Sequence, residues 1–246
     1  MKLNFNKQLR ESQLWFCLAV LSFFILSAQL LAQAPYLTPG HPDGIALLAP
    51  PPPAGSAEEA ADLASVRAVF QGRTAEELLR AKKDYSISLF LFAPAIGTNF
   101  QAGKFPLTEA LYAKVKASIG PAIDAPKNYW KRKRPYVLDP KLALGDPEPS
   151  ASYPSGHSAR GTVYALLVAE LFPDKKDAVL AIGRTIGWDR VLIGKHFPTD
   201  VQAGRVLGQA IYRELSKNAE FQHDLAEAKA EVATSMSKGN EGYRSH

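Results

Sequence analysis

Three short clusters in the second half of the chain carry residue types that bind anions and move protons. The first, residues 127–135, is rich in Lys and Arg. On a continuous helix ended by Pro135, Lys127 and Arg134 would lie on one face, two turns apart, where two cations can grip one anion. The stretch is also typical of a solvated basic surface or, because aromatic residues interleave with the basic ones, of a nucleic-acid patch. The basic excess stops there, so no nucleic-acid partner is expected.

The second cluster, residues 152–157, reads Ser-Tyr-Pro-Ser-Gly-His. Ser155 is predicted to cap a helix whose first N–H groups form an anion site. Gly156 has no side chain, so a ligand can approach its N–H closely, and His157 would supply a proton in the first turn. The alternative is an ordinary capped helix with an incidental histidine.

The third cluster runs from Arg190 to Asp200. Arg190 can bind an anion, and His196 is a candidate nucleophile or base. Asp200 follows four residues later, close enough to accept a hydrogen bond from the imidazole and fix its tautomer. Gly194 allows the chain to turn between Arg190 and His196. The alternative is a local turn in which Asp200 helps to cap the next helix.

Taken together, the clusters predict a phosphoryl-transfer site that uses no metal and no other cofactor. They combine three cations, a helix N-terminus, two histidines and one carboxylate. Few acidic clusters are available to hold Mg²⁺ or Zn²⁺, and no His-Glu-x-x-His motif occurs. Ser155 is not expected to be a nucleophile, because Gly-x-Ser-x-Gly is absent.

The elements that must position these clusters are predicted to be helices. Apolar residues recur with a period of 3.6 and alternating runs are few, so we expect an all-α, compact multi-helix domain with the active site between helices. The helix from Thr74 is expected to carry Tyr85 and Leu89, residues 138–153 to form a loop at the rim of the site, and residues 220–238 to form a solvated surface helix. Gly204 and Gly208, one turn apart, would permit close helix packing. Helices are expected to begin near Ser56, Thr74, Thr108, Ala122, Ser155, Asp174, Thr199 and Asn218.

The N-terminus resembles a secretory signal peptide, which predicts a periplasmic or secreted protein. A basic start precedes an apolar run at residues 14–26, and small residues follow. We expect a signal peptide at residues 1–34, a Pro-rich, extended and non-helical segment at 35–55, and a helical domain at 56–246. An uncleaved membrane anchor is the alternative; once cleaved, the protein would have no stable membrane span. Cys17 is the single cysteine, so an intrachain disulfide and a Cys-based zinc site are excluded.

In their order and spacing, Lys127-x6-Arg134-Pro135, Pro154-Ser155-Gly156-His157 and Arg190-x5-His196-x3-Asp200 resemble the signature of the phosphatidic acid phosphatase type 2 superfamily. The similarity is greatest to the bacterial class A non-specific acid phosphatases, and it extends to the proline tract at residues 48–54. One departure is Asp189, where the family usually has Ser. That carboxylate is expected either to weaken the grip of Arg190 on phosphate or to hold Arg190 in place.

The resemblance implies a mechanism. His196 would attack phosphorus and become phosphohistidine, with Asp200 orienting it. His157 would protonate the leaving alcohol and then act as base for water. The residues expected to bind the phosphate are Lys127, Arg134, Ser155, Gly156 and Arg190.

The resemblance also implies small-molecule phosphomonoester substrates such as nucleotides or sugar phosphates, inhibition by vanadate, and a homo-oligomer. Three other functions remain open at this point. A vanadium-dependent haloperoxidase would use the same cage, because vanadate copies phosphate geometry. A lipid phosphatase would usually have several membrane spans. A non-catalytic phosphate- or nucleic-acid-binding protein would bind anions without turnover.

Overall fold

The computed structural model describes residues 35–83 and 85–244, and these contain helices and no strand. The chain divides into two compact units, residues 1–35 and 36–246. The predicted signal peptide, residues 1–34, lies outside the described residues. Within the described ranges, no helix combines the length and apolar character needed to cross a membrane. The all-α prediction is therefore confirmed for the part of the chain that can be described.

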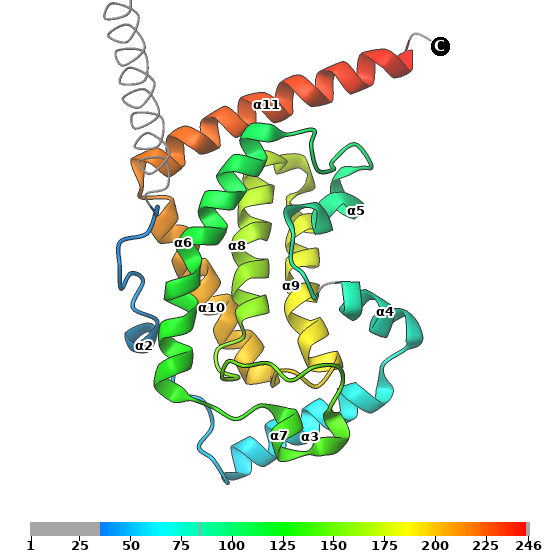
Figure 1. Cartoon of the computed structure of the whole chain (residues 1–246). Coiled ribbons are helices and arrows are strands. Elements are labelled where there is room, and N and C mark those ends of the chain that lie inside the picture. The colour runs from blue at the N-terminus through cyan, green and yellow to red at the C-terminus, as the bar shows by residue number, and fades with distance from the viewer. Residues whose placement is uncertain (1–34, 84, 245–246) are drawn as a thin grey trace, which may run out of the picture. The chain divides into compact units, whose positions relative to one another are not determined.

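Three helices form the centre of the second unit: α8 (Gly156–Leu171), α9 (Lys176–Leu192) and α10 (Pro198–Leu215) (Figure 1). Most residues of α8 are buried, which is typical of a helix surrounded by others on all sides. The long helices α6 (Pro106–Trp130) and α11 (Ala219–Arg244) pack against one another and against α8. Helices α8 and α9 run in opposite directions, so the N-terminus of α8 and the C-terminus of α9 lie at the same end of the bundle.

Shorter helices surround this centre. Two of the predicted starts are confirmed by their capping bonds, because Ser56 Oγ accepts from the Glu59 N–H at 3.1 Å and Thr74 Oγ1 accepts from the Glu77 N–H at 3.1 Å. The helices that follow these caps, α3 and α4, both pack against α9. The shorter elements are α2 (Gly44–Leu47), α3 (Ala57–Gly72), α4 (Ala75–Lys83), η1 (Leu89–Phe92), α5 (Ala93–Ile96), α7 (Pro135–Leu138), η2 (Pro140–Leu142) and η3 (Pro173–Lys175).

Helix α6 differs from the prediction of separate helices near Thr108 and Ala122. It runs unbroken through Pro121 and Pro126. Each proline removes one backbone donor. The helix persists because its buried face, including Val115, Ile119 and Ile123, packs into the core.

Three other expectations also need correction. Helix α4 ends at Lys83, so Tyr85 and Leu89 lie outside it. Leu89 belongs to η1, where its side chain is buried. The Pro-rich segment contains one helical turn, α2, because Asp43 accepts from the first N–H groups of that turn. Helix α11 is not fully solvated, because one of its faces is buried in the core; the buried residues on that face are Phe221, Leu225, Ala228 and Val232.

Gly204 and Gly208 permit the close approach of α10 to α8, as predicted. A Cβ added at Gly204 would lie 2.5 Å from the Ser155 carbonyl oxygen, and one at Gly208 would lie 2.6 Å from the Ala159 carbonyl oxygen. The α10 backbone therefore rests directly on the first turn of α8. This contact fixes the capped end of α8 relative to α10.

We expect Gly204→Ala to lower the free energy of unfolding by roughly 1–3 kcal/mol, because the new methyl group forces the two backbones apart. Gly120→Ala is the matched control, since no atom lies within 4 Å of an added Cβ there. That variant should be as stable as the wild type, or more stable by about 0.4–1 kcal/mol. Urea unfolding measures both. Equal stability of the two variants would contradict the close packing.

Candidate active site

Lys127 and Arg134 lie close together, although not on one helix face as predicted. Helix α6 ends at Trp130, and Lys131 adopts a left-handed conformation with φ of 49°. Arg134 is extended, as expected of a residue before proline. The chain turn, rather than helix periodicity, brings the two buried cations together. Both donate to the Ala151 carbonyl oxygen, Lys127 Nζ at 2.7 Å and Arg134 Nη2 at 3.4 Å.

Ser155 caps α8 as predicted, and its buried Oγ accepts from the Ser158 N–H at 3.3 Å. Its own N–H donates to the Asp200 carbonyl oxygen at 2.9 Å, which joins the second cluster to the third. Gly156 faces the cations: a Cβ there would lie 2.9 Å from Arg160 Nη1 and 3.5 Å from Lys127 Cε. The first turn of α8 is thus lined by positive charge, and only glycine leaves room for an anion beside it.

Arg190 is fully buried near the C-terminus of α9. Its Nη2 donates to the carboxylate of Glu148, while its Nε and Nη1 are buried with no hydrogen-bond partner among the described residues. Unsatisfied buried donors of a charged group are costly, and native proteins rarely retain them without reason. An anion beside Arg190 would satisfy both.

His196 is buried between a carboxylate and a guanidinium. Its Nδ1 lies 3.3 Å from Asp200 Oδ2, and its Nε2 lies 3.3 Å from Arg134 Nη1. Because the carboxylate accepts and the guanidinium donates, the tautomer that fits carries its proton on Nδ1, and its Nε2 lone pair accepts from Arg134. Burial, followed by the charges of Arg134 and Lys127, lowers the pKa of His196 well below its usual value. The geometry presents an uncharged nucleophilic nitrogen.

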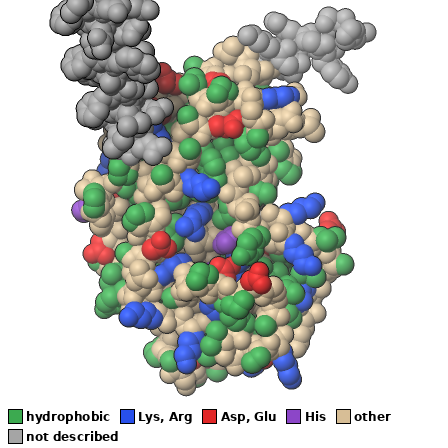
Figure 2. Space-filling model, viewed as in Figure 1, with side chains coloured by type: hydrophobic (Ala, Val, Ile, Leu, Met, Phe, Trp, Pro, Cys, Tyr) green, Lys and Arg blue, Asp and Glu red, His purple; other side chains and the backbone are tan. Residues whose placement is uncertain are grey.

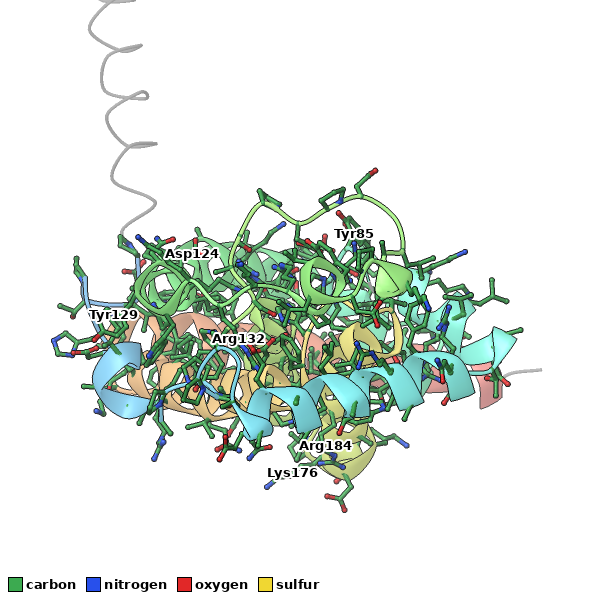
Figure 3. The ribbon with its side chains drawn as sticks, turned by 90° about the horizontal axis from the view of Figure 1, so that it is seen from below. Tyr85, Asp124, Tyr129, Arg132, Lys176 and Arg184 are labelled. Atoms are coloured by element: carbon green, nitrogen blue, oxygen red, sulfur yellow. The ribbon has the colours of Figure 1, made fainter. Side chains whose placement is uncertain are left out.

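A network of residues to which the sequence analysis assigned no role fixes Asp200. Its Oδ2 accepts from Ser152 Oγ at 2.5 Å, and its Oδ1 accepts from Arg132 Nη1 at 2.7 Å. Arg132 in turn forms an ion pair with Asp62 of α3 at 2.9 Å. Figure 3 shows Arg132 in the middle of the molecule and Tyr129 at its edge. Within one basic stretch of sequence, burial separates the functional cations from the surface ones.

The Phe197 N–H also donates to Asp200 Oδ2, at 3.0 Å, which caps α10. The geometry therefore agrees with both interpretations of the third cluster, because Asp200 contacts the imidazole and also caps a helix. Gly194 makes the expected turn, with φ of +68°, and a Cβ there would lie 2.5 Å from the Leu142 carbonyl oxygen.

His157 has a different environment from His196. It lies half-buried in the first turn of α8, and its Nε2 lies 3.1 Å from the Tyr85 carbonyl oxygen. A carbonyl only accepts, so Nε2 carries a proton and Nδ1 is left for other contacts. Burial, with the charge of Arg190 second, lowers the pKa of His157 to about 3. Tyr85 carried no signal in the sequence, because a backbone carbonyl looks the same in every residue.

The loop predicted at residues 138–153 begins later, because η2 occupies Pro140–Leu142. Residues 143–155 form the loop, and they supply acceptors for the cations of the site. Arg134 Nε donates to the Ser150 carbonyl oxygen at 2.9 Å, and Glu148 pairs with Arg190. Burial, followed by the charge of Arg134, lowers the pKa of Lys127 to about 7. The cations therefore repel one another in the free site, so a bound anion would relieve that repulsion.

Asp189 was expected either to weaken the grip of Arg190 on phosphate or to hold Arg190 in place, but its carboxylate binds another arginine. Its carboxylate is engaged by Arg80 of α4, with Arg80 Nη2 at 2.9 Å from Oδ1 and Nε at 3.1 Å from Oδ2.

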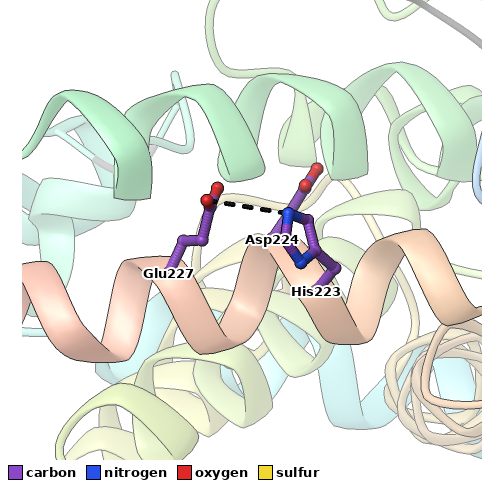
Figure 4. A group of neighbouring side chains, drawn as sticks. All are labelled: His223, Asp224 and Glu227. Carbon is purple, nitrogen blue, oxygen red and sulfur yellow. Dashed lines mark ion pairs between the residues drawn. The ribbon is translucent and has the colours of Figure 1, made fainter.

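Figure 2 shows a histidine near the middle of one face of the molecule, with Lys and Arg side chains above it and acidic side chains below. Three side chains of the kinds that can bind a metal ion, His223, Asp224 and Glu227, lie together on α11 (Figure 4). They are at the other end of the bundle from the α8 N-terminus. Asp224 already accepts from Lys114 Nζ at 2.8 Å and from Tyr36 OH at 2.5 Å. That cluster has no part in the site described above.

Comparison with known proteins relates the whole arrangement to phosphatases. The PAP2 superfamily matches residues 108–220. An acid phosphatase of Zymomonas mobilis is 33% identical over 201 residues, which cover 78% of this chain and 76% of that protein. Non-specific acid phosphatases of Providencia stuartii and Salmonella typhimurium are 30% and 29% identical, over 78% and 74% of this chain and 81% and 78% of theirs.

The depressed pKa of His157 predicts how stability depends on pH. An unfolded chain protonates this histidine below about pH 6.5, whereas the folded chain does so only near pH 3. The unfolded state therefore binds more protons in this window, and the free energy of unfolding falls as the pH falls from 6.5 toward 3. The contribution of this one group reaches up to about 2 kcal/mol at pH 5.

Urea unfolding at pH 7 and pH 5 measures this effect. His157→Asn should lose less stability than the wild type between the two pH values, whereas His223→Asn, which removes an exposed imidazole on α11, should behave like the wild type. Inorganic phosphate should reduce the loss in the wild type, because the anion favours the charged histidine. A loss in His157→Asn as large as in the wild type would refute the assignment.

Proposed function

This chain belongs to the PAP2 superfamily and is an acid phosphatase, and we propose that it hydrolyses phosphomonoesters through a phosphohistidine formed on His196, without a metal ion. One observation carries the proposal. His196 is held with Nδ1 toward Asp200 and Nε2 toward the guanidinium of Arg134, so its unprotonated Nε2 points at a group that would bind phosphate. Nucleophile, orienting carboxylate and anion-binding cation lie within one cluster.

Five residues would bind the phosphate. Arg190 brings two buried donors that have no partner among the described residues. Arg134, whose guanidinium donates to the carbonyl oxygens of Ser150 and Lys195, adds a buried positive charge. Gly156, at the start of α8, lies beside Lys127 and Arg160, and its N–H would add a donor. The groups that would hold the equatorial oxygens are Lys127, Arg134, Ser155, Gly156 and Arg190. Their charge would stabilise the transition state, in which negative charge is spread over those oxygens.

In the first step, the Nε2 lone pair of His196 forms a bond to phosphorus while the bond from phosphorus to the ester oxygen breaks. His157 gives its Nδ1 proton to the departing oxygen, so the alcohol leaves neutral. Asp200 keeps the Nδ1–H of His196 and stabilises the positive charge on that imidazole. In the second step, His157 takes a proton from water, the water oxygen attacks phosphorus, and the bond from nitrogen to phosphorus breaks.

The substrate itself prepares His157 for this role. In the free site, burial and Arg190 hold the pKa of His157 at about 3, so the imidazole is neutral. A bound phosphate dianion places negative charge beside His157 and raises that pKa. The proton then resides on His157 when there is a leaving group to receive it. Catalysis is expected to be strongest at acidic pH, because His157 must be protonated while His196 is not.

We propose that cations replace the metal in this enzyme. The two carboxylates beside the site are engaged by arginines, Asp200 by Arg132 and Glu148 by Arg190. Export through the N-terminal signal, inhibition by vanadate and substrates such as nucleotides or sugar phosphates belong to the same proposal. A homo-oligomer stays a prediction.

His196→Ala should lower phosphate release from p-nitrophenyl phosphate by at least about 10⁴-fold, because the attacking nitrogen is gone. The assay runs at pH 5–7 with and without EDTA, and the exported form is used. EDTA should leave the wild-type rate unchanged. His223→Ala is the control and should retain full activity. Loss of wild-type activity in EDTA, or turnover by His196→Ala, would overturn the metal-free phosphohistidine mechanism.

His157→Ala should affect poor leaving groups most. Phenyl phosphate releases a phenolate about as basic as that of tyrosine, with a conjugate-acid pKa of about 10, so it needs the proton. Its kcat/KM should fall by about 10²-fold or more, whereas p-nitrophenyl phosphate, which leaves as a much weaker base, should fall far less. Equal losses for the two esters would exclude His157 as the general acid.

A further inference from the structure

An ion pair that takes no part in phosphate binding ties α4 to α9 beside the site. Arg80 of α4 contacts both carboxylate oxygens of Asp189 through Nη2 and Nε, at 2.9 and 3.1 Å. The Asp189 side chain is completely buried, whereas that of Arg80 is 40% exposed. A two-point contact of this kind fixes direction as well as distance. The pair therefore sets where the C-terminal half of α4 lies on α9.

The two partners are next to site residues in the sequence. Asp189 directly precedes Arg190, and Arg80 lies one turn before the end of α4, after which the chain reaches Tyr85. Tyr85 contacts both His157 and Arg190. Its carbonyl oxygen lies 3.1 Å from His157 Nε2, and its ring centroid lies 5.6 Å from the Arg190 guanidinium carbon.

Tyr85 has little support of its own. Its side chain is 57% exposed. A cavity of about 350 Å³ adjoins it, lined by Ala81, Lys82 and Tyr85 and also by residues 144–146, Ile193 and Lys195. On the far side of Tyr85 the chain is held by Tyr112, whose hydroxyl donates to the Ile87 carbonyl oxygen at 2.9 Å. On the near side, the position of the Tyr85 carbonyl would depend on how firmly α4 is attached to α9.

We propose that Arg80 and Asp189 are positioning residues for the general acid: their ion pair holds the segment after α4 so that the Tyr85 carbonyl accepts the Nε2 proton of His157 and Nδ1 is left to protonate the leaving oxygen. This inference rests on the proposed function. The proton on Nε2 stays in place throughout. Only the Nδ1 proton moves, to the ester oxygen as its bond to phosphorus breaks, which leaves a neutral imidazole with Nε2–H still bonded to the carbonyl.

The proposal makes a claim that a purely structural ion pair does not. If the pair only stabilised the fold, weakening it would reduce the amount of folded enzyme and lower activity toward every ester equally. If it positions His157, weakening it should selectively slow the release of basic leaving groups. The ratio of kcat/KM values for p-nitrophenyl and phenyl phosphate, measured on one preparation, is independent of the folded fraction.

The test compares Asp189→Ser with the wild type. Serine removes the buried carboxylate and so avoids the uncompensated buried charge that Arg80→Ala would leave. We expect kcat/KM for phenyl phosphate to fall about tenfold more than for p-nitrophenyl phosphate, a fraction of the full contribution of a general acid. Lys229→Ala is the control, because it removes an ion pair with Glu170 whose two side chains are 43% and 49% exposed. Its ratio should equal that of the wild type.

Two further variants keep the result decisive. In a His157→Ala background, Asp189→Ser should not change the ratio again, because the group it positions is absent. Arg80→Lys keeps a charge beside Asp189 but loses the two-point contact, and it should shift the ratio in the same direction by a smaller factor. An unchanged ratio in Asp189→Ser, or a shift that persists without His157, would refute the inference.

Failure of the inference and failure of the proposed function look different. If the wild type hydrolyses both esters and His196→Ala hydrolyses neither, the proposed function stands whatever the Asp189→Ser ratio is. If the wild type hydrolyses neither ester, the proposed function itself fails.

Discussion

The dominant constraint on this structure is the burial of a cluster of cations at one end of a helix bundle. Lys127, Arg134 and Arg190 are each at most 4% exposed, and each would be costly to bury without compensation. The loop before α8 provides part of that compensation through the carbonyls of Ser150 and Ala151 and the carboxylate of Glu148. The compensation is incomplete at Arg190, which keeps two donors unsatisfied. A phosphate would complete it, so the protein stores part of its binding energy as unsatisfied charge.

Burial and the neighbouring cations together set the charge of the two histidines. Burial is the larger cause and favours the neutral imidazole, and the cations act in the same direction, so both pKa values are depressed. The orienting groups then separate the two roles. His196 faces the carboxylate of Asp200, which stabilises the positive charge that a nucleophilic nitrogen acquires. His157 faces a neutral carbonyl, which fixes the direction of the ring and leaves its proton easier to release.

What the sequence could predict follows the range of the interactions involved. Ser155, Gly194 and Asp200 act through neighbours within a few residues, and capping and turn patterns identified their local geometry correctly. Tertiary burial decided the rest: α6 continues through two prolines because its face is buried, and the turn after Trp130 brings Arg134 to Lys127. Asp62, Glu148 and Tyr85 reach the site across 42 to 137 positions, and nothing in their local sequence marks them.

These long-range contacts indicate how the enzyme is divided. All the residues proposed to react or to bind phosphate lie within residues 108–220, the part that the PAP2 superfamily matches. The helices α3 and α4 precede that part, and each reaches one histidine. From α3, Asp62 holds Arg132, which holds Asp200 beside His196. From α4, Arg80 pairs with Asp189, and the Tyr85 carbonyl oxygen lies 3.1 Å from His157 Nε2. In the proposed mechanism, the matched region would contribute the reacting groups, while the two helices before it would contribute the orientation that a preorganised site requires.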